Sequence, residues 1–171
     1  MIYKNLLISL LLVFFYGCST STKLNVEVDT LNNFNIDNYN DFYININAEK
    51  VSAEINPLDL EKVKFAITNA LIDRGLSESK QASIEFNIMI STKDEIESDP
   101  LRSRYSYYYW DPYYRNDIRT ISKYFLRINI KDLKEEKIVW TIVTGWRSGS
   151  SNNPISDDGL AILIDEIMTN L

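Results

Sequence analysis

Neighbouring carboxylates are the side chains of this 171-residue chain that could most directly support catalysis. They stand at Glu135–Glu136, Asp157–Asp158 and Asp165–Glu166, and two carboxyl groups that converge in a fold can serve as the acid and base of a glycosidase. Their positions favour simpler interpretations, namely a turn, a helix N-terminus and a solvated helix face. The chain has no histidine, which removes Ser-His-Asp and Cys-His catalysis and the commonest transition-metal ligand. We therefore predict a non-enzymatic protein with no catalytic residue, no metal site and no cofactor.

The single cysteine, Cys18, follows a segment with the features of a signal peptide. A positive charge lies near the amino terminus, and residues 6–16 are largely apolar. This run is shorter than the roughly 20 residues of a membrane-spanning helix, but it suits a secretory signal. Gly17 and Cys18, followed by a polar Ser/Thr segment, resemble the lipobox of bacterial lipoproteins. Phe15 and Tyr16 are bulkier than the residues usual at those positions of the lipobox.

The lipobox resemblance implies a lipid anchor. Residues 1–17 would be removed, Cys18 would carry a diacylglyceryl group and fatty acids such as palmitate, and residues 18–23 would form a short tether. Several acyl chains hold a protein at a membrane stably, because each buried methylene contributes about 0.8 kcal/mol. Ser19, in place of an aspartate, implies sorting to an outer membrane, with the protein facing the periplasm. The open alternatives are an ordinary signal peptide with an incidental cysteine and an uncleaved anchor.

A tyrosine-rich segment, RSRYSYYYWDPYYR at residues 102–115, is the second distinctive feature. It falls in a loop expected at about 93–118, much longer than the two to five residues of ordinary hairpin loops. Tyr, Trp and Arg side chains dominate binding hot spots, and aromatic rings can also stack on sugars or lie at the level of lipid headgroups. The open alternatives are an additional strand and a segment without fixed structure. The candidate binding residues are Arg104, Tyr107, Tyr108, Tyr109, Trp110, Tyr113, Tyr114 and Arg115.

The composition narrows the class of partner. Removal of residues 1–17 takes away one lysine and no acid, so the formal net charge changes from −6 to −7. Nucleic-acid binding needs clustered Lys and Arg to neutralise phosphates, and we expect no nucleic-acid partner here. The remaining residues, 24–171, are enough for a single domain with its own core. A core without disulfides must be stabilised by burial, which the 45% hydrophobic content allows.

Hydrophobic periodicity predicts five strands and two helices. The first helix should begin with Asn56 as N-cap and Pro57 as its first residue, and end at Gly75. The second should begin at Ser156, with Asp157 placed favourably for the helix dipole. Apolar and polar residues alternate, as in half-buried strands, near residues 24–29, 42–46, 83–92, 124–131 and 138–146.

The order β-β-α-β-β-β-α predicts an α+β fold. We expect a two-layer sandwich, in which a mainly antiparallel sheet of four or five strands is covered by both helices. If the strands on either side of the first helix are neighbours, their connection should be a right-handed parallel crossover. Trp140 and Trp146 share a strand face with Ile138 and Ile142, which predicts core packing. Arg147, on the opposite face, should be solvated.

Three stretches carry a family resemblance: "ALIDRGL", "ASIEFNIMIS" and "YFLRINIKDLKEEKIVWTIVTGW". Together with the lipobox they resemble the bacterial lipoproteins grouped as domain of unknown function 4136, whose strand and turn motifs are matched by Asp132, Val139, Trp140 and Gly145. The resemblance implies an α+β envelope lipoprotein and brings no catalytic residues. A weaker likeness, of topology alone, is to the lipoprotein that plugs the lipopolysaccharide-transport barrel.

These observations give one leading functional hypothesis. The protein is expected to be a membrane-anchored, non-enzymatic lipoprotein of the cell envelope, which binds an envelope protein or a glycan through the tyrosine-rich loop. One alternative is a periplasmic carrier or sensor of lipid or another small apolar ligand, with a cavity between sheet and helices. Another is a structural scaffold without separate activity.

Overall fold

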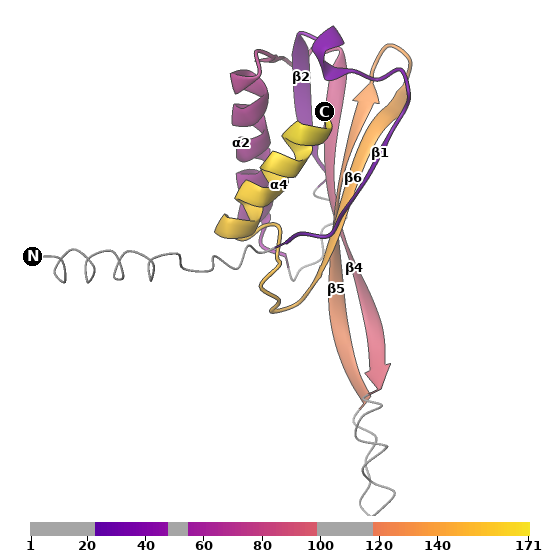
Figure 1. The fold of residues 1–171 in the computed structure, drawn as a ribbon, viewed down its shortest axis with the longest axis vertical. Helices are drawn as coiled ribbons and strands as arrows, with labels where there is room; N and C mark the ends of the chain where they lie inside the picture. Colours follow the sequence, from indigo (N-terminus) through magenta and orange to yellow (C-terminus); the bar gives the residue numbers. More distant parts are fainter. Residues whose placement is uncertain (1–22, 48–54, 99–117) are drawn as a thin grey trace, which may run out of the picture.

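A computed structural model describes residues 23–47, 55–98 and 118–171. In these ranges the chain forms two layers, with one sheet covered on one face by two helices (Figure 1). The α+β class and the two covering helices agree with the prediction. The elements in chain order are β1 (Val26–Thr30), η1 (Ile36–Asn38), β2 (Asp41–Ile46), α2 (Pro57–Asp73), β3 (Ser77–Glu78), β4 (Ile84–Ser98), β5 (Ile118–Asp132), β6 (Lys137–Arg147) and α4 (Asp157–Asn170).

The sheet differs from the predicted one in its number of strands. The described residues form six strands in the order β1-β6-β5-β4-β2-β3, whereas four or five were expected. The extra strand is β3, which has two residues and is too short to show an alternating pattern. The pairs β1–β6, β6–β5 and β5–β4 are antiparallel, but β2 is parallel to both β3 and β4. The sheet is therefore mixed, because α2 carries the chain from the end of β2 back to the start of β3 and β4.

Local capping interactions begin and end α2 where the sequence predicts. The Asn56 side chain accepts a hydrogen bond from the Leu58 amide at 3.1 Å, and Pro57 is the first helical residue. After the helix, Gly75 has φ +103°, a conformation that glycine adopts without the steric cost of a Cβ atom. These contacts fix the direction in which the chain enters and leaves the helix layer.

The start of α4 also agrees with the prediction. Ser156 Oγ accepts a hydrogen bond from the Gly159 amide at 3.2 Å, and two acids, Asp157 and Asp158, lie in the first turn, where the helix dipole favours negative charge. At the other end, Trp140 Nε1 donates a hydrogen bond to the Asn170 carbonyl oxygen at 3.0 Å. The helix is therefore tied to β6 at its C-terminus.

The core lies between the helices and the sheet face that they cover, which we call the inner face. Each fully buried apolar side chain contributes roughly 1.5–3 kcal/mol. Both tryptophans predicted to be internal are buried, Trp140 at 1% and Trp146 at 6% exposure. The other large buried side chains include Phe42, Ile44, Phe86, Ile88, Leu126, Ile128 and Ile130 of the sheet, and Leu60, Val63, Ile67, Leu71, Leu163 and Ile167 of the helices.

One residue predicted for the core, Ile138, points the other way. Trp140 pairs with Ile130, but Ile138 pairs with Lys131, so Val139 is an extra residue on β6. Such a β-bulge reverses the inward and outward alternation on either side of it. Val139 is consequently buried at 7% exposure, while Ile138 is 55% exposed. The prediction for Ile138 was wrong because simple alternation takes no account of a bulge.

The predicted loop at about 93–118 is shorter than expected. β4 continues to Ser98 and β5 begins at Ile118, so residues 93–98 and 118 lie in strands. The two strands pair along their whole length, from Ile84 with Asp132 to Ser98 with Ile118. The ends of the tyrosine-rich segment are therefore attached to neighbouring strands of one hairpin.

Candidate functional site

The residues predicted to be functional from the sequence lie outside the described residues. They comprise the lipidation candidate Cys18 and the binding candidates Arg104, Tyr107, Tyr108, Tyr109, Trp110, Tyr113, Tyr114 and Arg115. The described residues give the framework that holds both segments: Lys23 leads into β1, and the hairpin of β4 and β5 carries the tyrosine-rich segment.

The far end of this hairpin is a two-stranded arm, formed by residues 94–98 and 118–122. β6 pairs with β5 from Lys123 onward, and β2 pairs with β4 no further than Ile88. Among the described strands, the arm therefore pairs with no third strand, although at its base the Ser148 amide donates a hydrogen bond to the Ser122 carbonyl oxygen at 3.2 Å. Figure 1 shows the arm extending away from the helices. Its five residue pairs make it about 17 Å long. Ser122 Oγ donates a hydrogen bond to Asp94 Oδ1 at 2.7 Å across the arm.

The sheet face opposite the helices, which we call the outer face, carries a row of cations. Lys93 on β4 pairs with Lys123 on β5, and Lys123 pairs with Arg147 on β6. Residues paired in register point to the same face of a sheet, so these three side chains form a transverse row, the cation row. Arg147 is exposed, as predicted.

Glu95 contributes a negative charge beside this row. Its carboxylate accepts a hydrogen bond from Lys123 Nζ and lies 3.6 Å from Lys93 Nζ. The hydrogen bond from Lys123 is the main reason why the pKa of Glu95 is lowered, and the positive charges of Lys123 and Lys93 add to the effect. The carboxylate therefore stays ionised and offsets part of the positive charge of the row.

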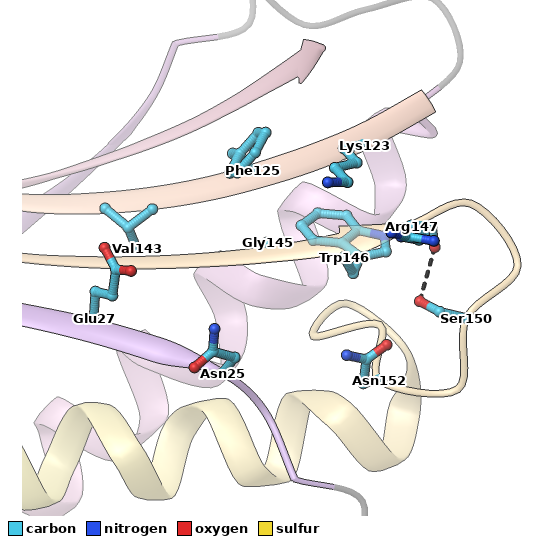
Figure 2. Close-up of a pocket in the computed structure, with 10 residues that line it drawn as sticks. All are labelled: Asn25, Glu27, Lys123, Phe125, Val143, Gly145, Trp146, Arg147, Ser150 and Asn152. Carbon is cyan, nitrogen blue, oxygen red and sulfur yellow. Dashed lines mark hydrogen bonds between the residues drawn. The ribbon is translucent and has the colours of Figure 1, made fainter. Parts of the chain in front are cut away.

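Two hollows lie on the outer face next to the cation row. The first, of about 380 Å³, is drawn in Figure 2 and is lined by residues of β1, β5, β6 and the loop after β6. The second, of about 360 Å³, is lined by residues of β4, β5 and β6. Both include Phe125 and Val143, so these two side chains lie between the hollows and join them. We call the combined surface the outer groove.

The polar wall of the first hollow comes from segments far apart in the chain. Asn25 and Glu27 approach from the β1 side, and Ser150 and Asn152 from the loop after β6 (Figure 2). The loop is held near β6 because Ser150 Oγ donates a hydrogen bond to the Arg147 carbonyl oxygen at 2.8 Å. The groove thus combines amide, hydroxyl and charged groups around an apolar centre.

The position of the Phe125 ring depends on a glycine on the next strand. Phe125 pairs with Gly145, and a Cβ atom added to Gly145 would lie 3.0 Å from Phe125 Cε1 and 3.1 Å from Cδ1. The ring therefore occupies the space above the glycine, an arrangement by which aromatic residues cover glycines in sheets. The half-buried ring forms a firm apolar centre in the groove.

A row of amides borders the groove on the side opposite the cation row. Three amides and one hydroxyl, those of Asn45, Asn87, Asn129 and Thr141, are register partners across β2, β4, β5 and β6, and we call them the amide row. Asp29 on β1 is the next register partner, opposite Thr141. Thr141 Oγ1 donates a hydrogen bond to Asn129 Oδ1 at 2.6 Å, and Asn45 Nδ2 donates to Glu85 Oε1 at 3.0 Å. These bonds fix the side chains of the row in place.

The described residues contain no cluster of three or more side chains of the Cys, Asp and Glu type that could hold a metal ion. No helix within the described ranges is long and apolar enough to span a membrane. The acid pairs of the sequence lie where the simpler interpretations put them: Asp157 and Asp158 in the first turn of α4, and Glu135 and Glu136 in the turn between β5 and β6.

Residues 26–171 match the family described as domain of unknown function, DUF4136. The chain belongs to the DUF4136 family. The match begins at β1 and extends to the end of α4, and it confirms the family resemblance recognised in the sequence. No curated protein matches the chain.

Solved structures resemble the DUF4136 chain only remotely. A PDZ domain protein from Parabacteroides distasonis aligns with a TM-score of 0.46 and 13% identity over 81% of this chain, which spans only 34% of that protein. A PelC dodecamer from Paraburkholderia phytofirmans aligns with a TM-score of 0.48 and 10% sequence identity, covering 86% of this chain and 96% of that one. A minor lipoprotein from Acinetobacter baumannii aligns with a TM-score of 0.36 and 10% sequence identity, covering 77% of this chain and 87% of that one.

The outer groove of this DUF4136 protein was missed in the sequence, although one signal was present. In β5 the outward positions carry Lys123, Phe125 and Arg127 in succession, so a large aromatic residue stands on the polar side of an alternating strand. An aromatic side chain at a solvated position is a feature of binding surfaces. Which residues of β4 and β6 flank it depends on the register, which the sequence does not give.

Proposed function

We propose that this DUF4136 protein is a lipid-anchored, non-enzymatic lipoprotein of the bacterial envelope that binds an envelope partner at the end of its arm. Cys18 would attach it to the membrane, in the outer membrane facing the periplasm. The tyrosine-rich segment would make the contact, with Arg104, Trp110 and Arg115 among its binding residues.

The observation that carries this proposal is the continuous pairing of β4 with β5 out to Ser98 and Ile118. A binding segment needs a support away from the body of the protein, and the chain enters and leaves the stretch that contains the segment at Ser98 and Ile118, which are paired at the end of the arm. The exposed Ile96, at 75%, adds apolar surface to the arm itself. Aromatic and apolar side chains near one another are typical of interface centres.

The carrier hypothesis receives less support from the geometry. An apolar ligand would need space between the layers, but Phe42, Phe86 and Ile128 on the inner face are each 0% exposed and pack with the helices. The two hollows described above lie on the outer face. A carrier of this kind would need a cavity between the sheet and the helices. In the described residues that space is filled by the protein's own side chains.

Photo-crosslinking in intact cells tests the proposed function. A photoreactive residue is placed at Tyr109 in the tyrosine-rich segment and, as a matched control, at Lys134. Lys134 is exposed in the turn at the opposite end of β5, about 48 Å from the start of that strand. We expect a discrete adduct from position 109 and none from position 134, because only the first belongs to the proposed binding segment.

The mass of the adduct would identify the partner as a protein or a glycan. Equal labelling from both positions, or none from either, would contradict binding by the arm and leave the scaffold interpretation. A separate measurement tests the anchor: metabolic labelling with palmitate should mark the protein and be lost in Cys18→Ser. Labelling that survives the substitution would exclude Cys18 as the lipidation site.

A further inference from the structure

The outer face sorts its side chains by chemistry into rows that cross the strands. The cation row lies at one side of the outer groove and the amide row at the other, six residues apart along β5 from Lys123 to Asn129. This separation corresponds to about 20 Å. Between them lie Phe125 and, two residues on, Arg127, with the two hollows on either side of the phenyl ring. The groove and both rows therefore run in the same direction, across the strands.

The cation row brings like charges close together, and Glu95 offsets part of them. Like charges directly opposite one another destabilise a sheet, and Lys93, Lys123 and Arg147 occupy three such positions in succession. Neighbouring strands are about 4.8 Å apart, so positive charge recurs at roughly that spacing along the groove. The described acids of this surface are unevenly placed. Glu95 lies at the cation row and Glu27 lines the first hollow. In contrast, Asp29, the register partner of Thr141, and Glu85, the hydrogen-bond partner of Asn45, lie at the amide row. Positive charge is therefore concentrated at the cation-row side of the groove, which favours a ligand that places its acidic groups there.

The centre of the groove is shaped for a ring. Phe125 lies over Gly145, so one face of its ring is supported by the sheet. Val143 and Met89 continue the apolar surface on the neighbouring strands. An aromatic face offers a large contact area with few rotors to immobilise, which suits stacking against the apolar face of a sugar.

The exposed and half-buried members of the amide row, Asn45, Asn87 and Thr141, supply hydrogen-bonding groups at the far side. The buried Asn129 holds Thr141 in place. Asn and Gln side chains both donate and accept, and so match hydroxyl groups, which do the same. Asn25, Asn152 and Ser150 provide similar groups at the end of the groove nearest β1. Cations along one side, an aromatic centre and amides along the other side correspond to the acidic groups, rings and hydroxyls of a charged carbohydrate.

We infer that the outer groove binds an anionic glycan, a sugar chain bearing carboxylate or phosphate groups, which lies across β6, β5 and β4 with its acidic groups on the cation row. An anionic lipid fits less well, because the apolar floor consists of Phe125, Val143 and Met89 in an open groove and has no enclosed space for acyl chains. The inference does not depend on the arm, since neither hollow includes residues 94–98 or 118–122. The crosslinking at Tyr109 can fail while this inference holds.

Calorimetric titration of the full-length protein in detergent micelles tests the inference. The anionic probes are an oligogalacturonate, which carries carboxylates, and a phosphomannan, which carries phosphates. Neutral maltotetraose, polyglutamate without sugar rings, and micelles containing phosphatidylglycerol serve as comparisons. We expect at least one anionic glycan to bind, more weakly as salt is raised, and to bind more tightly than each of the three comparisons.

Matched variants locate the binding. Lys93→Gln combined with Arg147→Gln should weaken binding at least tenfold, whereas Lys134→Gln combined with Lys137→Gln removes the same charge at the opposite end of β5 and should change it less than twofold. Phe125→Leu, which keeps an apolar side chain over Gly145, should weaken it at least threefold, with unfolding curves showing that each variant is folded. Failure of both anionic glycans to bind would overturn the inference. So would equal binding of polyglutamate, binding only to the lipid-containing micelles, or equal weakening by both charge variants.

Discussion

The Tyr39 hydroxyl donates a hydrogen bond of 2.7 Å to Asp132 Oδ2, joining residues 93 positions apart. Tyr39 follows η1, and Asp132 is the last residue of β5. Asp132 Oδ1 also accepts hydrogen bonds from the amides of Lys134 at 2.8 Å and Glu135 at 2.9 Å. The carboxylate, 8% exposed, therefore holds the β5–β6 turn and ties it to the chain between β1 and β2.

Replacement of Tyr39 by phenylalanine should destabilise the protein. The substitution keeps the ring but removes the donor to a buried carboxylate, and hydrogen bonds to charged groups contribute about 1.5–3 kcal/mol. Because Tyr39 is only half-buried, we expect a loss of about 1–2 kcal/mol in the free energy of unfolding, measured by urea denaturation. Tyr43→Phe, at a half-buried position on β2, is the control and should change it by less than about 0.5 kcal/mol. Equal effects would contradict a specific role for the hydroxyl.

The same pair predicts a dependence of stability on pH. Burial and the hydrogen bond to Asp132 raise the pKa of Tyr39 to about 12. The contribution of the Tyr39 hydroxyl to the free energy of unfolding is therefore complete below the ordinary tyrosine pKa of about 10. It is lost as the pH rises toward 12. The hydrogen bonds from the Glu135 amide and the Tyr39 hydroxyl lower the pKa of Asp132. The contribution of the Asp132 carboxylate to stability is therefore present above the ordinary aspartate pKa of about 3.9 and is lost in more acidic solution. The difference in stability between the protein and Tyr39→Phe should thus be constant from about pH 5 to 9 and shrink on both sides. A difference that grows above pH 10 would show that the sign is wrong.

Two threonines of β6 should respond in opposite ways to replacement by valine. Thr144 is 2% exposed, and its Oγ1 is buried without a hydrogen-bond partner, so Thr144→Val should raise the free energy of unfolding by about 1 kcal/mol. Thr141 Oγ1 donates to Asn129 Oδ1, and Thr141→Val should lower it by about 1 kcal/mol because a largely buried amide loses a partner. Denaturant unfolding of both variants checks the prediction. A loss of stability in Thr144→Val would mean that its hydroxyl makes a stabilising contact.

Gly145→Ala should be unfavourable only while Phe125 is present. The added methyl group would lie 3.0 Å from the Phe125 ring, and displacing the ring should cost about 1 kcal/mol. In a Phe125→Ala background the contact is gone, and alanine should be neutral or stabilise by about 0.5–1 kcal/mol relative to glycine. A double-mutant cycle measures the coupling between the two positions. Additive effects would contradict the close approach of ring and glycine.

Gly159→Ala should be the most damaging of these substitutions. A Cβ atom at Gly159 would lie 2.0 Å from the Asn153 carbonyl oxygen and 3.0 Å from Ser156 Oγ. The obstacle is backbone, which cannot move aside as a side chain can, so we expect a loss of about 3 kcal/mol. Ala161→Ser, at an exposed position of the same helix, should change stability by less than about 0.5 kcal/mol. Thermal unfolding of the two variants distinguishes them, and similar midpoints would disprove the predicted clash.

The sequence by itself determined the local features of this protein. Asn56 and Ser156 cap their helices, and Gly75 has the positive φ expected of a glycine that ends a helix. Each of these depends on a residue and its neighbours within a few positions, where capping and steric effects act. The alternation in β4 and β5 likewise predicted which side chains are buried, because period-two burial belongs to a strand whatever its partners.

Only the tertiary structure decided how distant segments meet. The bulge that exposes Ile138, the pairing of the short β3 with β2, and the extension of β4 to Ser98 all depend on cross-strand register. The same register brings Lys93, Lys123 and Arg147 into one row and places Phe125 over Gly145. Register is set by the packing of the whole inner face and by the turn geometry, which no single stretch of sequence contains. The outer groove is therefore a product of the assembled sheet.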